Sequence, residues 1–158
     1  MKKTALITSL LALAVSVWFV PSAFAADEKD EPEVKITIPD TAAGILKDVK
    51  QHEEELAKTI SDKKLDDVHH HAFAIRDLVN ALPDKSKDLT GDKLSKLKAN
   101  AKFVADLAKR LDESGDGKDQ AGTEANFKKL QGILKQIRSL YPSDASNKGM
   151  DDMPGMQK

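Results

Sequence analysis

The residues best suited to chemistry are the four histidines of the chain, His52 and the consecutive His69, His70 and His71. Neutral imidazole is a common ligand of Zn²⁺, Cu²⁺ and Ni²⁺. Successive residues on a helix point about 100° apart, so the three neighbours cannot all bind one ion. A metal site therefore needs His52 together with one of the three, and we expect His70 to face solvent.

His52 stands on the apolar stripe of one predicted helix, and the histidine triplet stands on the next. A tight turn between these helices would place His52 opposite Ala72, whose small side chain leaves room for an imidazole. His69 and His71 flank Ala72, and His71 is the better partner because its counterpart in the second half of the chain is a core position. Glutamates at 53–55 would add a carboxylate. The alternative is that His52 is an ordinary, partly buried polar side chain without a ligand.

A second set of candidate ligands lies near the C-terminus, where Met150, Met153 and Met156 stand three residues apart. Thioether sulfur is a soft, neutral donor that suits Cu(I) and has little affinity for Mg²⁺ or Ca²⁺. Pro154 and Gly155 disfavour a helix here, so residues 143–158 are expected to form a flexible tail rich in Met and Asp. This tail would capture copper, or it is a solubilising tail whose methionines bind nothing.

The N-terminal residues 1–25 have the pattern of a cleaved secretory signal peptide. Two lysines precede an apolar run, and the run is followed by Ala23-Phe24-Ala25, a small-x-small cleavage site. We expect cleavage after Ala25 and export to the periplasm, with no membrane span afterwards, since no later apolar run approaches about 20 residues. An uncleaved membrane anchor is the alternative that this cleavage site disfavours.

Composition removes several classes of function. The 25 basic and 26 acidic residues leave no basic surplus for binding nucleic acid. Cysteine is absent, which excludes disulfides, thiolate nucleophiles and thiolate metal sites. The chain has no phosphate-binding glycine loop, no nucleophile elbow and no His-Glu-x-x-His motif. We therefore do not expect an enzyme.

The remaining chain divides into an acidic, extended lead-in at 26–39 and a helical domain at 40–142. Four apolar stripes in this domain advance in steps of three and four residues, as amphipathic helices do. They cover residues 45–60, 65–82, 94–111 and 123–141. Short connections between such helices predict an all-α fold, an antiparallel up-down-up-down four-helix bundle.

Turn residues give the expected helix ends. Asp40 or Thr41 is a suitable N-cap for the first helix. Pro83 is expected to end the second helix and Pro142 to close the fourth. Polar loops are expected at 84–92 and 112–122.

The two halves of the domain resemble each other, which indicates a duplicated helical hairpin. Aligning them matches His52 with Phe103 and His71 with Leu130. The second half is eight residues longer between the matched segments, and we assign these residues to a longer loop.

The segment DVHHHAFAIRDLVNALP (67–83) resembles a segment of small exported helical-bundle proteins of bacteria. The domain is also loosely similar to periplasmic metal-binding four-helix bundles, and the methionine spacing is similar to that of periplasmic copper-handling proteins. These resemblances imply a bundle that buffers or delivers a metal ion, copper first and Zn²⁺ or Ni²⁺ after it. The alternative is a helical adaptor that docks an envelope protein without a metal.

Overall fold

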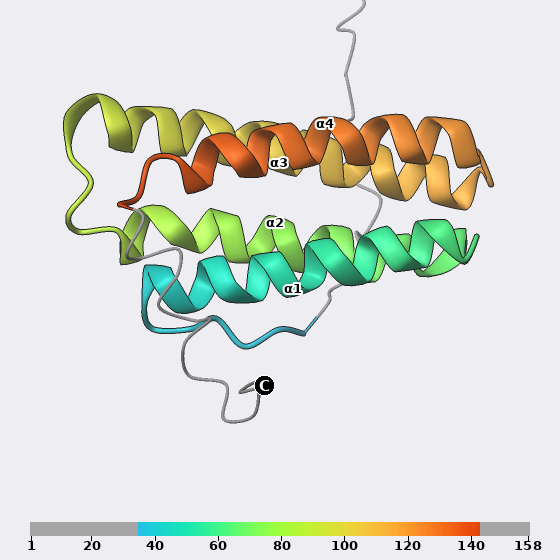
Figure 1. Cartoon of the computed structure of the whole chain (residues 1–158), viewed down its shortest axis with the longest axis horizontal. Coiled ribbons are helices and arrows are strands. Elements are labelled where there is room, and N and C mark those ends of the chain that lie inside the picture. The colour runs from blue at the N-terminus through green and yellow to red at the C-terminus, as the bar shows by residue number, and fades with distance from the viewer. Residues whose placement is uncertain (1–34, 143–158) are drawn as a thin grey trace, which may run out of the picture. The chain divides into compact units, whose positions relative to one another are not determined.

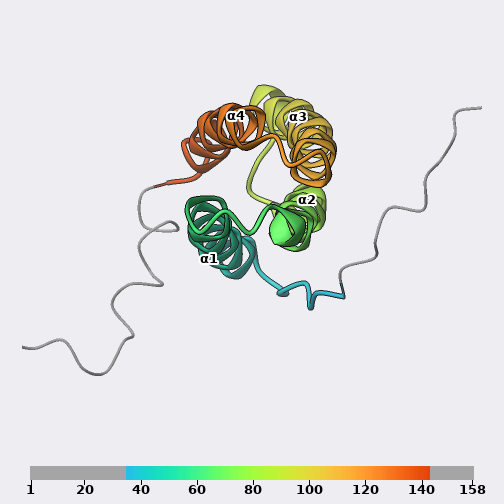
Figure 2. The ribbon, with the colours of Figure 1, turned by 90° about the vertical axis from the view of Figure 1, so that its right-hand side faces the viewer.

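The computed structural model describes residues 35–142. The expected signal peptide, residues 26–34 of the lead-in and the methionine tail lie outside the described residues. Four helices make up this part of the chain: α1 (Ala42–Ser61), α2 (Val68–Lys85), α3 (Gly91–Asp116) and α4 (Gln120–Arg138). Successive helices run antiparallel (Figure 1), and seen end-on they stand in a ring in chain order (Figure 2). The predicted all-α up-down-up-down bundle is confirmed.

The first helix begins where the sequence predicts. The Thr41 side chain caps it, since its Oγ1 accepts a hydrogen bond of 3.1 Å from the backbone N–H of Gly44. The helix ends at Ser61, and Lys63 turns the chain with a positive φ of 58°. A short 3-10 helix, η1 (Leu65–Asp67), leads into α2.

Pro83 does not end the second helix, contrary to the prediction. It lies inside α2, which continues to Lys85. A proline inside a helix removes one backbone hydrogen bond, but tertiary packing can outweigh that loss. Here Leu82 before it and Leu89 after it are both buried, and the Ser86 hydroxyl donates to the Leu82 carbonyl at 2.6 Å. The last turn of α2 and the residues that follow it, 82–89, are thus held against the core.

The prediction of a long loop at 112–122 is also wrong, because α3 runs to Asp116 and α4 begins at Gln120. Gly115 is buried within α3, and a Cβ added to it would lie 2.6 Å from the Leu65 carbonyl oxygen. Glycine therefore serves close helix packing here and does not mark a loop. The extra residues of the second half of the domain thus lie in α3 and not in a loop. The connection between α3 and α4 is shorter than the connection between α1 and α2. α4 likewise ends at Arg138, before the predicted Pro142.

The core is apolar and continuous along all four helices. The stripes predicted from the sequence are buried at most positions. Phe73, Leu78, Leu46 and Leu107 join them, and these four lie beside the stripes on the same helices. Residues 35–39 form neither helix nor strand, and Ile36 and Ile38 pack against the core.

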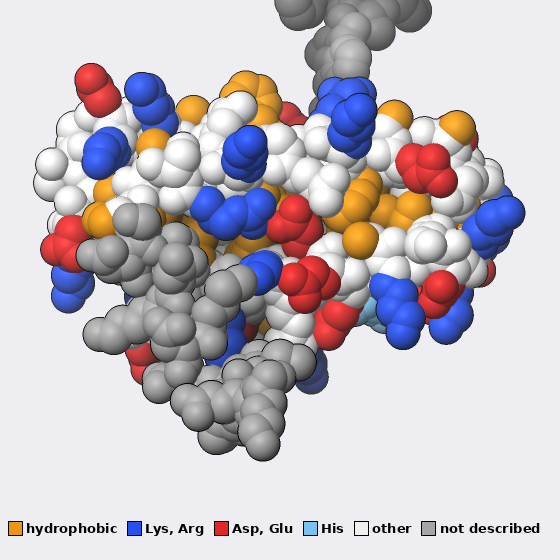
Figure 3. Space-filling model, in the orientation of Figure 1, with side chains coloured by type: hydrophobic (Ala, Val, Ile, Leu, Met, Phe, Trp, Pro, Cys, Tyr) orange, Lys and Arg blue, Asp and Glu red, His pale blue; other side chains and the backbone are white. Residues whose placement is uncertain are grey.

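Charged side chains are scattered over the visible part of the face that α1 and α4 share, and apolar side chains are visible between the two helices (Figure 3). An ion pair crosses this boundary from Arg138 Nη1 to Glu53 Oε2 at 2.8 Å. Gln120 of α4 also donates to the Ile60 carbonyl at 3.0 Å. Within residues 35–142, no helix combines the length and apolar composition that crossing a bilayer requires.

Candidate metal centre

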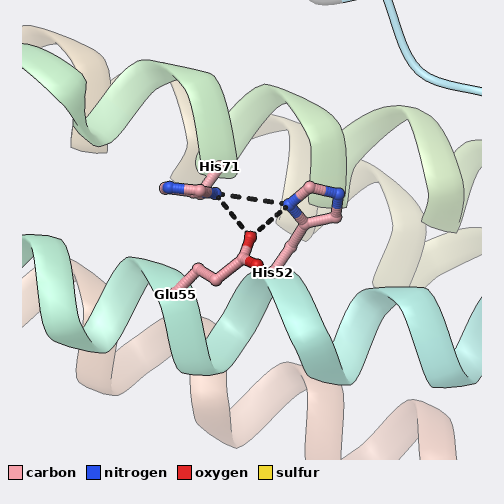
Figure 4. A group of neighbouring side chains, drawn as sticks. All are labelled: His52, Glu55 and His71. Carbon is pink, nitrogen blue, oxygen red and sulfur yellow. Dashed lines mark hydrogen bonds and ion pairs between the residues drawn. The ribbon is translucent and has the colours of Figure 1, made fainter.

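Two histidines and one glutamate meet between α1 and α2 (Figure 4). The Nδ1 atoms of His52 and His71 lie 3.3 Å apart. Glu55 Oε2 lies 3.4 Å from the first and 3.3 Å from the second. Three potential ligand atoms thus converge on one point, and we call this set the His–Glu cluster.

Helical spacing explains the convergence. His52 and Glu55 are three residues apart on α1, so they share a face of that helix. His71 approaches from α2 beside Ala72, which is fully buried and leaves room for the ring. The prediction that His52 faces His71 across the first hairpin is confirmed. His69 is not part of the cluster.

The other two histidines are not members of the cluster. The rings of His69 and His70 pack against each other, with centroids 4.0 Å apart. His70 is exposed, as predicted. The predicted ligands Met150, Met153 and Met156 lie outside the described residues.

The three consecutive glutamates separate into different roles. Glu53 turns to Arg138 of α4, and Glu54 lies 3.9 Å from Lys50 at the surface. Glu55 alone reaches the imidazoles. Gln51 fixes its orientation, because its Nε2 donates to Glu55 Oε1 at 3.0 Å and leaves Oε2 directed at the histidines.

Gln51 was not foreseen as part of the site. Its spacing of four residues from Glu55 is the signal that could have found it. Such supporting hydrogen bonds orient the carboxylates of metal sites and raise the affinity for the ion.

The cluster needs a positive charge or a proton at its centre. Two imidazole lone pairs and a carboxylate oxygen that face one another at 3.3–3.4 Å would repel. A proton on either Nδ1 satisfies this requirement, and a metal ion can take its place. Burial is the largest cause that lowers the pKa of His71, opposed by the charge of Glu55 and reinforced by His52. A lowered pKa keeps His71 neutral, which is the form that binds metals.

No family model, no curated protein and no solved structure matches this chain.

Proposed function

We propose that this protein binds a transition-metal ion at the His–Glu cluster and buffers it or hands it on. The observation that supports this function best is the spacing of the three donor atoms, 3.3, 3.3 and 3.4 Å. A tetrahedral zinc site with bonds of about 2.0–2.1 Å has donors about 3.3–3.4 Å apart. The side chains therefore stand near three corners of a tetrahedron.

The same spacing narrows the choice of metal. In square-planar or octahedral sites with bonds of about 2.1 Å, neighbouring donors are about 3.0 Å apart. Cu²⁺, Ni²⁺ and Mg²⁺ prefer those geometries, whereas Zn²⁺ imposes none and accepts two imidazoles with a carboxylate. Zn²⁺ is thus the ion that the three donors would take by themselves. The copper expected from the sequence depends on the methionine tail.

Exposure favours an exchangeable ion. The side chains of His52 and His71 are about a quarter exposed, and Glu55 is 41% exposed. An ion could enter and leave without unfolding of the bundle. Structural zinc sites, by contrast, have four protein ligands. Together with the predicted signal peptide, this supports a role in metal buffering or delivery in the periplasm.

The test is a titration of the metal-free protein with Zn²⁺ in competition with a chromophoric chelator. We expect one ion per chain, and a loss of affinity of at least tenfold in His71→Ala and in Glu55→Gln. His70→Ala and Glu54→Gln are the matched controls, since each changes an adjacent residue outside the cluster. Circular dichroism checks that every variant is folded. Failure of the wild type to compete, or equal losses in the controls, would refute the proposal.

A second candidate function, a metal-independent adaptor, is favoured by one observation. Phe103 on α3 is 56% exposed, the one large hydrophobic residue with high exposure among residues 35–142. A photo-crosslinking amino acid at this position would trap an envelope partner in living cells, and the same group at exposed Lys102 is the control. A single product specific to position 103, formed equally by His71→Ala, would support the adaptor. Labelling that is the same at both positions would reject it.

A further inference from the structure

A cavity of about 380 Å³ lies between α3 and the end of α4, outside the His–Glu cluster. It is partly open to solvent, so a molecule can enter without unfolding of the bundle. Its volume lies within the range of small-molecule sites, about 300–1,000 Å³. The six residues that line it are Lys96, Ala99, Asn100, Gln136, Ser139 and Leu140.

Asn100 is a polar residue at a core position of this cavity. It follows Leu97 by three residues and precedes Val104 by four, and it is 9% exposed. Among residues 35–142, no group forms a hydrogen bond with its side-chain amide. Burying an amide without a partner costs free energy, which a leucine at this position would avoid. The amide is therefore available to a molecule in the cavity.

The charge and the donors of the cavity favour an anion. Lys96 is the one charged residue among the six that line it, and a spacing of four residues places it next to Asn100 on α3. The amides of Asn100 and Gln136 add N–H donors. The Ser139 hydroxyl already donates to the Gln136 carbonyl at 2.7 Å. A carboxylate would thus find an ammonium group and two amide donors, whereas an amine would find no acidic partner.

Apolar surface continues from the cavity along α3. Ala99 and Leu140 supply the apolar part of the lining. Phe103 follows Ala99 by four residues, so it stands on the same face of the helix about 6 Å further along the axis. Its ring is 56% exposed. An alkyl chain attached to the carboxylate would cover this ring and bury apolar surface of both partners.

We propose that the cavity binds a free aliphatic carboxylate of medium chain length, with its head group at Asn100 and Lys96 and its alkyl chain directed toward Phe103. The proposal does not depend on a metal, because the His–Glu cluster lies between α1 and α2. It gives the exposed Phe103 ring a ligand in place of a protein partner.

The experiment titrates the full protein with octanoate and follows the side-chain amide signals by ¹H–¹⁵N NMR. Asn100→Leu removes the central amide and identifies its signals, and exposed Asn80→Leu on α2 is the matched control. Lys96→Gln removes the charge, with exposed Lys98→Gln as its control. Octylamine has an alkyl chain of the same length and the opposite charge. Thermal denaturation checks that every variant is folded.

We expect saturable shifts of the Asn100 signals with one octanoate per chain. Affinity should fall at least about tenfold in Asn100→Leu and for octylamine, and at least about threefold in Lys96→Gln, whereas both controls should change by less than about twofold. Phe103→Ala should weaken the binding of octanoate and leave that of butyrate unchanged, because the short chain stops before the ring.

Three results would overturn the proposal: absence of saturable shifts, octylamine that binds as tightly as octanoate, or unchanged octanoate affinity in Asn100→Leu. If Asn100→Leu does not fold, the comparison of Lys96→Gln with Lys98→Gln decides, and equal affinities of these two variants would overturn the proposal.

Discussion

The sequences of the two hairpins follow one apolar pattern, but the residues at their matched positions differ in burial and in contacts. In the first hairpin His52 and His71 are partly buried and meet at 3.3 Å. In the second hairpin the matched Phe103 is 56% exposed and the matched Leu130 is fully buried. The polar pair meets between α1 and α2, whereas one of the corresponding apolar residues of the other hairpin is exposed and the other is buried.

The helix connections set which residues face each other within each hairpin. Contacts near the second connection, Ser114 with Thr123 at 3.0 Å and Asn126 with the Arg110 carbonyl at 3.2 Å, set the register of α3 and α4. Continued along both helices, this register places Phe103 opposite residues 133–134, about one helical turn beyond Leu130. The sequence repeat therefore preserves the helical pattern, but it does not preserve which residues face each other.

The largest expected effect comes from giving the first hairpin the residues of the second. In His52→Phe/His71→Leu both imidazoles are lost, so Zn²⁺ affinity should fall by at least about 100-fold. The urea midpoint should change little, because replacing both polar partners with apolar groups can be nearly neutral. The control is His69→Ala/His70→Ala, which keeps the cluster and should bind Zn²⁺ as the wild type does. Equal affinity of the two variants would show that the cluster is not the site.

Much of the fold could be predicted from the sequence because its cues are local and repeated. Apolar residues spaced by three and four positions predicted the four helices, and Thr41 was a predicted N-cap of the first helix. The errors lie at Pro83 and Gly115, where long-range packing outweighs local helix-breaking preferences. At the site, the pairing of His52 with His71 followed from one short turn. Glu55 lies three residues after His52, a local spacing that could have singled it out among the three glutamates. The pairing of Glu53 with Arg138, 85 positions away in sequence, could not be foreseen because it depends on how α4 packs against α1.

The next effect concerns the packing of η1, which connects α1 to α2, against α3 of the second hairpin. Gly115→Ala would bring a methyl group against the Leu65 carbonyl, where its distance of 2.6 Å requires a backbone shift. We expect a loss of about 1–3 kcal/mol in the free energy of unfolding, measured by urea denaturation. Gly132→Ala is the matched control, since nothing lies within 4 Å of its added Cβ, and it should stabilise by about 0.5–1 kcal/mol. A stable Gly115→Ala protein would mean that α3 does not pack closely on η1.

A smaller effect is the response of the metal-free protein to acid. The pKa of His71 is lowered in the folded state below its ordinary 6.5, chiefly by burial. Below that pH the unfolded chain binds a proton at this residue more readily than the folded protein does. Stability should therefore fall as the pH is lowered from 7 to 5, and it should fall less steeply in His71→Leu. Urea denaturation at several pH values measures both slopes, and equal slopes would show that His71 does not titrate differently on folding.

The smallest expected effect tests whether the second hairpin can be given the chemistry of the first. Phe103→His restores the matched histidine on α3, yet it should add no second Zn²⁺ to the stoichiometry. The new imidazole would stand at an exposed position, and its matched partner Leu130 is buried in the core. Three residues after it stands Asp106, whose side chain is shorter than that of a glutamate. Asp106→Glu added to Phe103→His supplies that carboxylate and should still bind no second ion, because the facing register is shifted by about one turn. Binding of a second ion by either variant would show that helix pattern alone, without the register set by the connection, is enough to build the site.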